Sequence, residues 1–321
     1  MFSKGAIIMA VKGIIRTMLG AAVFISMLAT LTPAVGQASV LPAVEQLTGI
    51  TMDKTVLQGP GRLATGGDGT LYVVDSLKNH ILKFDRNGKY VGDIAFPFAS
   101  AIAVAPNGTL YIGSHKDYAV SIVRNGQVTG YLGTGRNAFR SIRDIAVDPS
   151  RGVVYVVDNV GNAVRVFDLK GKELGAIDGV NLPVSIEVTD KEIYIIDAPL
   201  VTDVKGVTTA SRISVFDKDY KLVRTIDEPA GQHLMYRPTD ITVADGIVYI
   251  ADAALKSVLL FDTSGNFLGE IQSVNGAINT AVSLVISSDG ILYVAASEEH
   301  RVYMFALTAQ AGVGGNPGAG N

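Results

Sequence analysis

Gly69-Thr-Leu-Tyr-Val-Val-Asp75, continued by Asn79-His-Ile-Leu-Lys-Phe-Asp85, decides the fold, because the same pattern occurs six times along the chain. Its central tyrosine recurs at intervals of 39, 44, 39, 55 and 44 residues. Such a period, with short apolar runs between glycine turns, is typical of an array built from one repeated unit. Because each unit has the pattern of strands, the sequence predicts an all-β, six-bladed β-propeller. The six tyrosines are Tyr72, Tyr111, Tyr155, Tyr194, Tyr249 and Tyr293.

Each repeat contains four expected strands separated by turn residues. Asn-Gly and Asp-Gly pairs are strong hairpin signals, because their positive φ angles match the twist of the flanking strands. The pattern therefore predicts four-stranded antiparallel blades. In the second repeat the expected strands, from the innermost outward, are Ala101–Ala105, Leu110–Gly113, Val120–Arg124 and Val128–Leu132.

The two ends of the repeat array complement each other. The last repeat, Leu284–Leu307, has segments for only three strands, and the glycine-rich tail Gly312–Asn321 cannot supply a fourth. Thr48–Val56 is an apolar segment with no repeat partner. We expect it to form the outer strand of the last blade, which removes two exposed sheet edges.

The first 38 residues have the composition of a secretory signal peptide. Lys4, Lys12 and Arg16 precede an apolar run at Thr17–Leu31, and small residues at 36–38 fit a cleavage site. The run is shorter than the roughly 20 residues of a spanning helix, so we expect cleavage and no stable membrane insertion. The predicted parts are a signal peptide at 1–38, a lead-in at 39–47, a propeller at 48–307 and a disordered tail at 308–321.

Composition limits the partners. The net charge is −3 and the isoelectric point about 5.8, so no basic field is present to hold a nucleic acid or an anionic membrane. The absence of cysteine excludes disulfides and a lipid-anchored cysteine. We expect an exported monomer, in the periplasm or outside the cell.

Two repeated side chains are interpreted as architectural. The repeat tyrosines are expected in the core between blades. An aspartate follows most of them by three residues, and this recurrence indicates a turn-capping role more than catalysis. These aspartates are Asp75, Asp158, Asp197 and Asp252.

Strand direction places the loops on two faces. Loops between second and third strands emerge on the same side as the connections between blades, and the glycine hairpins emerge on the other. Three long segments are expected to form a wall on the first side: Gly133–Ser141, the insertion Pro199–Ala210, and Glu228–Arg237. Functional residues concentrate on such loops, although a solvated loop between unequal blades is an equally simple interpretation.

The residues that enter the six innermost strands should form a ring around the central channel. Asp144 and Asp240 are the only carboxylates in it. They could hold a cation, although two carboxylates fall short of the roughly 6–8 oxygen ligands of calcium, or they could cap strand and loop amides. The ring residues are Arg62, Ala101, Asp144, Ser185, Asp240 and Ser283.

The segment from Ile145 to Asn162, with the pattern Ile-Ala-Val-Asp-x-x-x-Gly-x-x-Tyr-Val-x-Asp-x-x-x-Asn, resembles an NHL repeat. The resemblance covers about residues 48–307. It implies a propeller that binds other macromolecules, although similar six-bladed propellers include lactonases, streptogramin lyases and peptide-amidating lyases that use histidine with a divalent ion. All four histidines, His80, His115, His233 and His300, are expected on the loop side.

We therefore predict a scaffold that binds a protein, peptide or glycan through its loop-rich face, with no catalytic residue, no metal ligand and no cofactor assigned. The alternative is a metal-dependent lyase or hydrolase, with calcium or zinc at the channel mouth. The residues expected in the binding site are Arg62, His115, Tyr118, Phe139, Arg143, Asp144, His233, Tyr236, Arg237 and Asp240.

Overall fold

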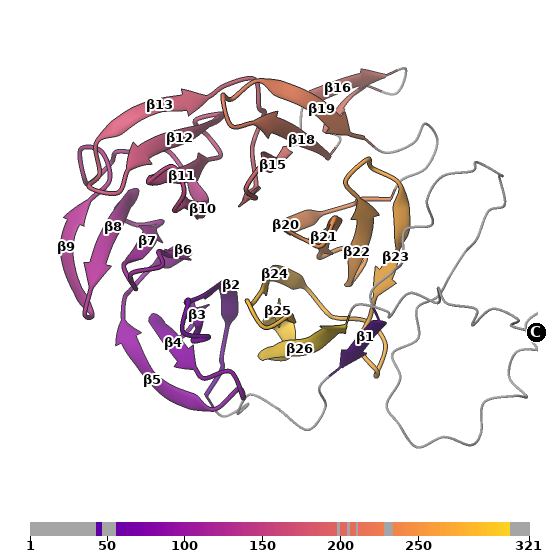
Figure 1. Ribbon diagram of the computed structural model, residues 1–321, viewed down its shortest axis with the longest axis horizontal. Coiled ribbons are helices and arrows are strands. Elements are labelled where there is room, and N and C mark those ends of the chain that lie inside the picture. The colour runs from indigo at the N-terminus through magenta and orange to yellow at the C-terminus, as the bar shows by residue number, and fades with distance from the viewer. Residues whose placement is uncertain are drawn as a thin grey trace, which may run out of the picture.

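Six four-stranded antiparallel sheets surround a central axis (Figure 1). The computed structural model describes residues 43–46, 56–197, 200–203, 206–209, 211–227 and 234–308. The predicted all-β, six-bladed propeller is confirmed. Within each of the first five blades the strands follow the chain from the axis outward, with the second and third repeat strands at the centre of the sheet.

The first three blades are built from consecutive strands. Blade 1 contains β2 (Pro60–Thr65), β3 (Leu71–Asp75), β4 (His80–Phe84) and β5 (Tyr90–Ala95). Blade 2 contains β6 (Ala99–Val104), β7 (Leu110–Ser114), β8 (Ala119–Arg124) and β9 (Gln127–Tyr131). Blade 3 contains β10 (Ile142–Asp148), β11 (Val153–Asp158), β12 (Ala163–Asp168) and β13 (Glu173–Ile177).

The last three blades contain the irregularities. Blade 4 contains β14 (Ser185–Val188), β15 (Glu192–Asp197), β18 (Arg212–Asp217) and β19 (Leu222–Ile226). Blade 5 contains β20 (Pro238–Ala244), β21 (Ile247–Asp252), β22 (Ser257–Asp262) and β23 (Phe267–Ile271). Blade 6 contains β24 (Ala281–Ile286), β25 (Ile291–Ala296), β26 (Arg301–Thr308) and β1 (Ala43–Gln46). The described residues contain one 3-10 turn, Ser297–Glu299, and no helix of the length and apolarity that crossing a bilayer requires.

An N-terminal strand completes the last blade, but it lies earlier in the chain than predicted. β1 pairs antiparallel with β26, with Ala43 opposite Thr308 and Gln46 opposite Phe305. The Gln46 side chain also accepts a hydrogen bond from the Val274 amide at 2.7 Å. The position expected for Thr48–Val56 is thus occupied by Ala43–Gln46, and residues 47–55 lie outside the described residues.

The insertion in the fourth repeat lies between β15 and β18, as predicted, but it is not an irregular loop. It contains a two-stranded antiparallel hairpin of β16 (Leu200–Asp203) and β17 (Gly206–Thr209). The alternating Val and Thr residues have high β propensity, which explains the pairing. The hairpin projects from the outside of blade 4 (Figure 1).

Five of the six repeat tyrosines are buried between blades, with 0–2% of their surface exposed. They are Tyr111, Tyr155, Tyr194, Tyr249 and Tyr293. Tyr72 also packs against the apolar cluster between blades 1 and 2, but it is only half-buried, so the prediction holds in part for its ring. The repeat phenylalanines are buried as well, and each interface between sheets is a separate apolar cluster.

The repeated aspartates cap loops, as predicted. Asp75 accepts hydrogen bonds from the amides of Gln58, Gly59 and Lys78 at 2.6–3.1 Å. The other three aspartates, Asp158, Asp197 and Asp252, likewise accept hydrogen bonds from backbone amides of the connection that leads into their blade. Asp158 and Asp252 also accept hydrogen bonds from amides of the turn that follows them in the chain. Asp197 additionally accepts from the Arg212 and Ser214 side chains. These buried carboxylates fasten the loop side of the blades.

Replacing Tyr155 by alanine tests the inter-blade core. Its fully buried ring lies edge-on to Tyr220, with 6.1 Å between ring centroids, so we expect a loss of about 3–5 kcal/mol in the free energy of unfolding. The measurement is denaturant unfolding. Tyr72→Ala, at the half-buried equivalent, is the matched control and should cost less than half as much. Equal losses would show that burial does not distinguish the two positions.

Candidate functional site

The central channel is blocked by a polar cluster, here called the plug, that consists of Arg62, Asp144, Ser185, Asp240 and Ser283. Each residue comes from the innermost strand of a different blade, at or near the point where that strand begins. Ala101, which is fully buried, takes the sixth position. The predicted ring is therefore confirmed, and it is closed by side-chain contacts.

Arg62 lies between the two carboxylates. Its Nη1 is 2.7 Å from Asp240 Oδ1 and 3.8 Å from Asp144 Oδ2, and its Nη2 donates to the Val184 carbonyl at 3.1 Å. Burial opposes the charge of the guanidinium, but attraction from the two aspartates outweighs it and raises the pKa of Arg62. The plug thus has a permanent cation at its centre.

Both aspartates are fully engaged within the plug. Asp240 Oδ2 accepts from Ser283 Oγ at 2.6 Å and the Leu284 amide at 2.9 Å, and its Oδ1 accepts the Ile241 amide at 3.1 Å. Asp144 accepts the amides of its own and the next blade, Ile145 at 2.9 Å and Ile186 at 3.0 Å. Capping of strand amides, one of the two roles left open by the sequence, is the role observed.

Ser185 connects the two carboxylates, with its Oγ 2.7 Å from Asp144 Oδ2 and 2.5 Å from Asp240 Oδ1. A hydroxyl has one proton to donate, so both contacts are hydrogen bonds only if one carboxyl is protonated. Burial raises the pKa of Asp144, although Arg62 opposes the shift and Asp240 adds to it. Below a pH of about 6 a protonated Asp144 donates to Ser185 while Ser185 donates to Asp240, and the plug is then electrically neutral.

On the loop side of the plug lies the axial cavity, of about 460 Å³, with Arg62 at its floor. Hydroxyl groups and the exposed side chains of His115 and Arg143 make up its polar lining, and its described lining residues include no aspartate or glutamate. Ser100 Oγ is buried here without a hydrogen-bond partner among the described residues. The polar lining residues above the floor are Ser76, Ser100, His115, Ser141, Arg143 and Thr239.

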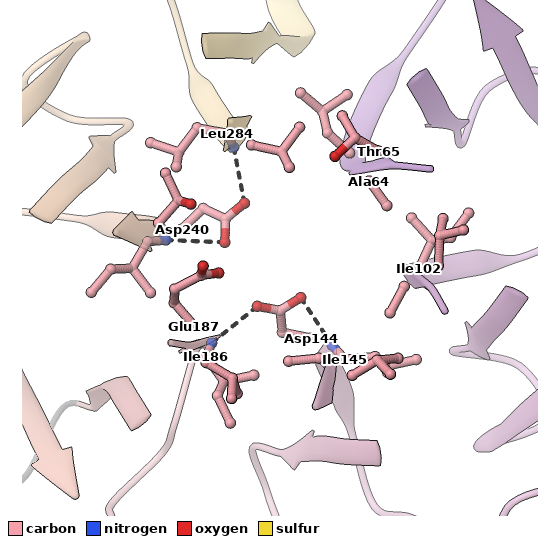
Figure 2. A pocket seen from close by; sticks show the side chains of 18 of the residues that line it. Ala64, Thr65, Ile102, Asp144, Ile145, Ile186, Glu187, Asp240 and Leu284 are labelled. Atoms are coloured by element: carbon pink, nitrogen blue, oxygen red, sulfur yellow. Dashed lines mark hydrogen bonds between the residues drawn. The ribbon is translucent and has the colours of Figure 1, made fainter. Parts of the chain in front are cut away.

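On the opposite side of the plug lies a lower cavity of about 270 Å³ (Figure 2). Glu187 points into it beside Asp144 and Asp240 (Figure 2). Desolvation and the two neighbouring aspartates raise the pKa of Glu187 to about 8, against the opposing hydrogen bonds of the Thr242 hydroxyl and the Val243 amide. Glu187 therefore binds a proton at neutral pH.

The remaining predicted binding residues are dispersed. His115 and Arg143 line the axial cavity. Tyr118, Tyr236 and Arg237 are exposed on loops, with 61% of the Tyr236 surface accessible. His233 and the rest of 228–233 lie outside the described residues, as do parts of the insertion, so the predicted wall is described only in part.

Phe139 does not line the binding surface. Its ring is buried, with 4% exposed, because it packs against Phe167 of blade 3 with 5.6 Å between centroids and is covered by the Arg165 guanidinium at 4.6 Å. An aromatic ring in a connection between blades gains more from the adjacent core than from water. It stabilises the base of the Gly133–Ser141 segment.

The three described histidines have separate environments. His80 Nδ1 pairs with Asp93 on the outer strand of blade 1, His300 Nδ1 contacts the Gln58 carbonyl, and His115 lies edge-on to Phe98. Across the described ranges no three side chains of His, Cys, Asp or Glu come together in a geometry that fits a metal ion. With Asp144 and Asp240 engaged by Arg62 and hydroxyls, the described part of the channel does not fit the metal site of the enzymatic alternative.

Sequence reasoning identified the ring but missed two of its properties. It did not pair Arg62 with Asp144 and Asp240, because these residues are 82 and 178 positions away. It also missed Glu187. The available signal was its position, two residues after the ring residue Ser185. At the same position, two residues after the ring residue, none of the other five innermost strands has an acidic residue.

The fold matches known structures at low sequence identity. A gluconolactonase from Xanthomonas campestris aligns over 90% of this chain and 98% of its own, with a TM-score of 0.64 and 18% identity. The hydrazine synthase of Kuenenia stuttgartiensis aligns over 79% of this chain and 78% of its own, with a TM-score of 0.59 and 19% identity. A streptogramin B lyase aligns over 83% of this chain and 97% of its own, with a TM-score of 0.57 and 11% identity.

These similarities establish the propeller architecture alone, because identities of 11–19% do not transfer an activity. No protein-family model matches the sequence, and no curated protein matches it significantly.

Removing the central cation tests the plug. Arg62→Met should lower the free energy of unfolding by about 3–5 kcal/mol at neutral pH, because buried carboxylates then lack their partner. Adding Asp240→Asn should recover part of the loss. The control is Arg143→Met, which replaces an exposed arginine of blade 3 and should change the free energy of unfolding by less than about 0.5 kcal/mol. A loss below about 1 kcal/mol for Arg62→Met in urea unfolding would contradict the plug.

The pKa of Glu187 predicts a pH dependence. Its folded-state pKa is raised from 4.5 to about 8, so the folded state binds more protons and stability falls as pH rises from about 5 to 8. Glu187→Gln should remove this loss, which is on the order of 3 kcal/mol. Glu192→Gln, at a glutamate whose pKa Arg224 lowers, should retain it. Parallel stability profiles for wild type and Glu187→Gln would contradict the assignment.

Proposed function

We propose that this protein is an exported binding module of the NHL-repeat type that holds a peptide or glycan ligand on its loop face. The observation that carries the proposal is the axial cavity. It opens among the loops, has a volume of about 460 Å³, and is closed below by the plug. A concave site with a few convergent polar groups on a rigid frame is the usual form of a ligand site.

The lining of the axial cavity favours recognition of a polar ligand. The unpartnered Ser100 Oγ can donate and accept a hydrogen bond. The hydroxyls of Ser76 and Thr239 donate to backbone carbonyls and can accept from a ligand. His115 and Arg143 supply exposed donors at the opening. Because the lining belongs to the ends of strands, its geometry is largely preformed, which reduces the entropic cost of binding.

Export fits the same proposal. We infer that residues 1–38 direct the chain out of the cytoplasm. In an oxidising compartment outside it, the stability of a chain without cysteine does not depend on disulfide formation. The ligand would then be a component of the cell envelope or of the surroundings.

A second candidate is a lyase or hydrolase with its site at the channel mouth. The specific observation in its favour is the fold shared with the gluconolactonase and the streptogramin B lyase. It ranks below binding because the two carboxylates of the channel are engaged by Arg62, Ser185 and Ser283. A catalytic metal site needs open coordination positions and at least three protein ligands.

Charge reversal on one face tests the proposed function. Peptide and glycan arrays are probed with wild type, Arg143→Glu and Lys170→Glu. The two variants carry the same change on opposite faces, because Lys170 lies in the hairpin turn after β12. Ligands of the wild type should bind Arg143→Glu at least ~10-fold more weakly, a typical effect for a lost charged hydrogen bond. They should bind Lys170→Glu with the affinity of the wild type.

Two results would overturn the binding proposal. One is binding that Arg143→Glu leaves intact. The other is stoichiometric zinc or calcium in the purified wild type that is lost in Asp240→Asn, accompanied by turnover of a lactone or ester substrate, which would establish the enzymatic alternative.

A further inference from the structure

Beside the axial cavity, on the same face, lies a second cavity of about 430 Å³ between blades 1 and 2. We call it the rim pocket. The connection between the two blades supplies Phe96 and Phe98, β9 supplies Tyr131, and Lys116 and Arg136 come from loops of blade 2. Phe98 and Tyr131 have 39% and 45% of their surface exposed. The rim pocket is thus a hollow with exposed aromatic and cationic groups.

The backbone at Phe98 is in an unfavourable conformation for its side chain. Its φ is +61°, in the left-handed region that bulky residues rarely adopt. The same position, three residues before the ring residue, also has positive φ at Leu182 and Thr280, so the fold imposes this backbone. The conformation is therefore architectural, and what distinguishes blade 2 is that the residue placed there is an aromatic exposed to the rim pocket.

Tyr118 repeats this observation on the neighbouring turn. It has a φ of +47° and 41% of its surface exposed. The equivalent positions in blades 1 and 3 are Asn79 and Asn162, the residue type that adopts the left-handed conformation most readily after glycine. Blade 2 therefore places an exposed aromatic at two loop-face positions where the backbone disfavours it.

The charges of the two cavities point to an anionic ligand. Lys116 Nζ lies 4.6 Å from the centre of the Phe98 ring. Asp117 is the one carboxylate among the described residues of the rim pocket, and it pairs with Arg136, with 3.6 Å between Oδ1 and Nε. The axial cavity adds the charge of Arg143 and the imidazole of His115. This positive region contrasts with the net charge of −3 for the whole chain.

The two cavities share a wall. Phe98 lines the rim pocket and His115 lines the axial cavity, and the two rings meet edge to face with 5.5 Å between their centres. A single extended ligand that passes over this pair reaches both cavities. Each residue of an extended chain spans about 3.3–3.6 Å, so a short peptide has the required length.

We propose that the loop face binds short peptides by their C-terminal end. The terminal carboxylate lies in the axial cavity with Arg143 and His115, and an aromatic side chain one to three residues upstream lies in the rim pocket beside Phe98 and Tyr131. Arginine and histidine supply charge-assisted hydrogen bonds to the carboxylate. The exposed rings supply edge or offset stacking. This inference rests on the proposed binding function and specifies its ligand.

The chain contains no tryptophan, so a tryptophan peptide reports its own binding by fluorescence. The probes are acetyl-Trp-Gly, acetyl-Trp-Gly-Gly and acetyl-Trp-Gly-Gly-Gly, each as the free carboxylate and as the neutral amide. At least one carboxylate should bind ~10-fold or more tightly than its amide, as expected for charged hydrogen bonds. In competition, replacing Trp by Ala in that peptide should weaken binding by at least about threefold.

Two glycine variants form a matched pair. Phe98→Gly removes the ring and relieves the left-handed backbone, and Leu182→Gly makes the same backbone change two blades away. Both should keep a Tm within about 4 °C of wild type. Phe98→Gly should weaken the best Trp peptide at least about threefold, whereas Leu182→Gly should leave its affinity unchanged. Arg143→Gln should reduce the preference for carboxylate over amide.

The outcomes separate this inference from the function it specifies. Equal affinity for carboxylate and amide peptides, or equal affinity for wild type and Phe98→Gly, overturns the peptide inference. If array ligands depend on Arg143 while a neutral oligosaccharide such as maltotriose displaces them and no Trp peptide binds, the binding function stands and its ligand is a glycan. If no array ligand depends on Arg143, the proposed function itself fails.

Discussion

The ion pair of Arg62 with Asp240, completed by Asp144, is the interaction on which the arrangement of the channel depends. Around it, hydrogen bonds from Ser185 and Ser283 and from strand amides connect the innermost strands of blades 1, 3, 4, 5 and 6. Blade 2 contributes Ala101, which has no polar side chain. The cluster therefore fixes the relative register of the blades at the axis and divides the channel into two cavities.

A buried charge cluster of this kind is costly, because the loss of hydration offsets much of the attraction between its charges. Desolvation opposes every charge in it. Each carboxylate oxygen of Asp144 and Asp240 accepts a hydrogen bond, and burial raises the pKa of Asp144 and of Glu187. The axial cavity thus has a polar floor, in which the Arg62 guanidinium lies between two carboxylates. The exposed cation above this floor, Arg143, favours a ligand with a negative charge.

The two faces of the ring differ in what they offer. On the hairpin side the turns are short and repeat with little variation. On the loop side, repeated aspartates hold the connections in place, and the residues that depart from the repeat pattern occur on this frame. Blade 2 departs most in exposed aromatics, with Phe98, Tyr118 and Tyr131. The architecture is shared with a gluconolactonase and a streptogramin B lyase, and in such a fold the function depends on the residues that the frame presents.

The sequence by itself determined what repeats and what is local: six blades from the spacing of the tyrosines, hairpins from Asn-Gly turns, and the ring residues from the start of each innermost strand. Only the tertiary structure decided which residues pair across the axis, that Glu187 lies beside two aspartates, that Phe139 is buried, and that Ala43–Gln46 is the closing strand. Strand periodicity and turn residues depend on interactions over a few positions, so they can be predicted from the sequence. Contacts such as Arg62 with Asp240 join residues far apart in the chain, and their partners depend on how the whole ring closes.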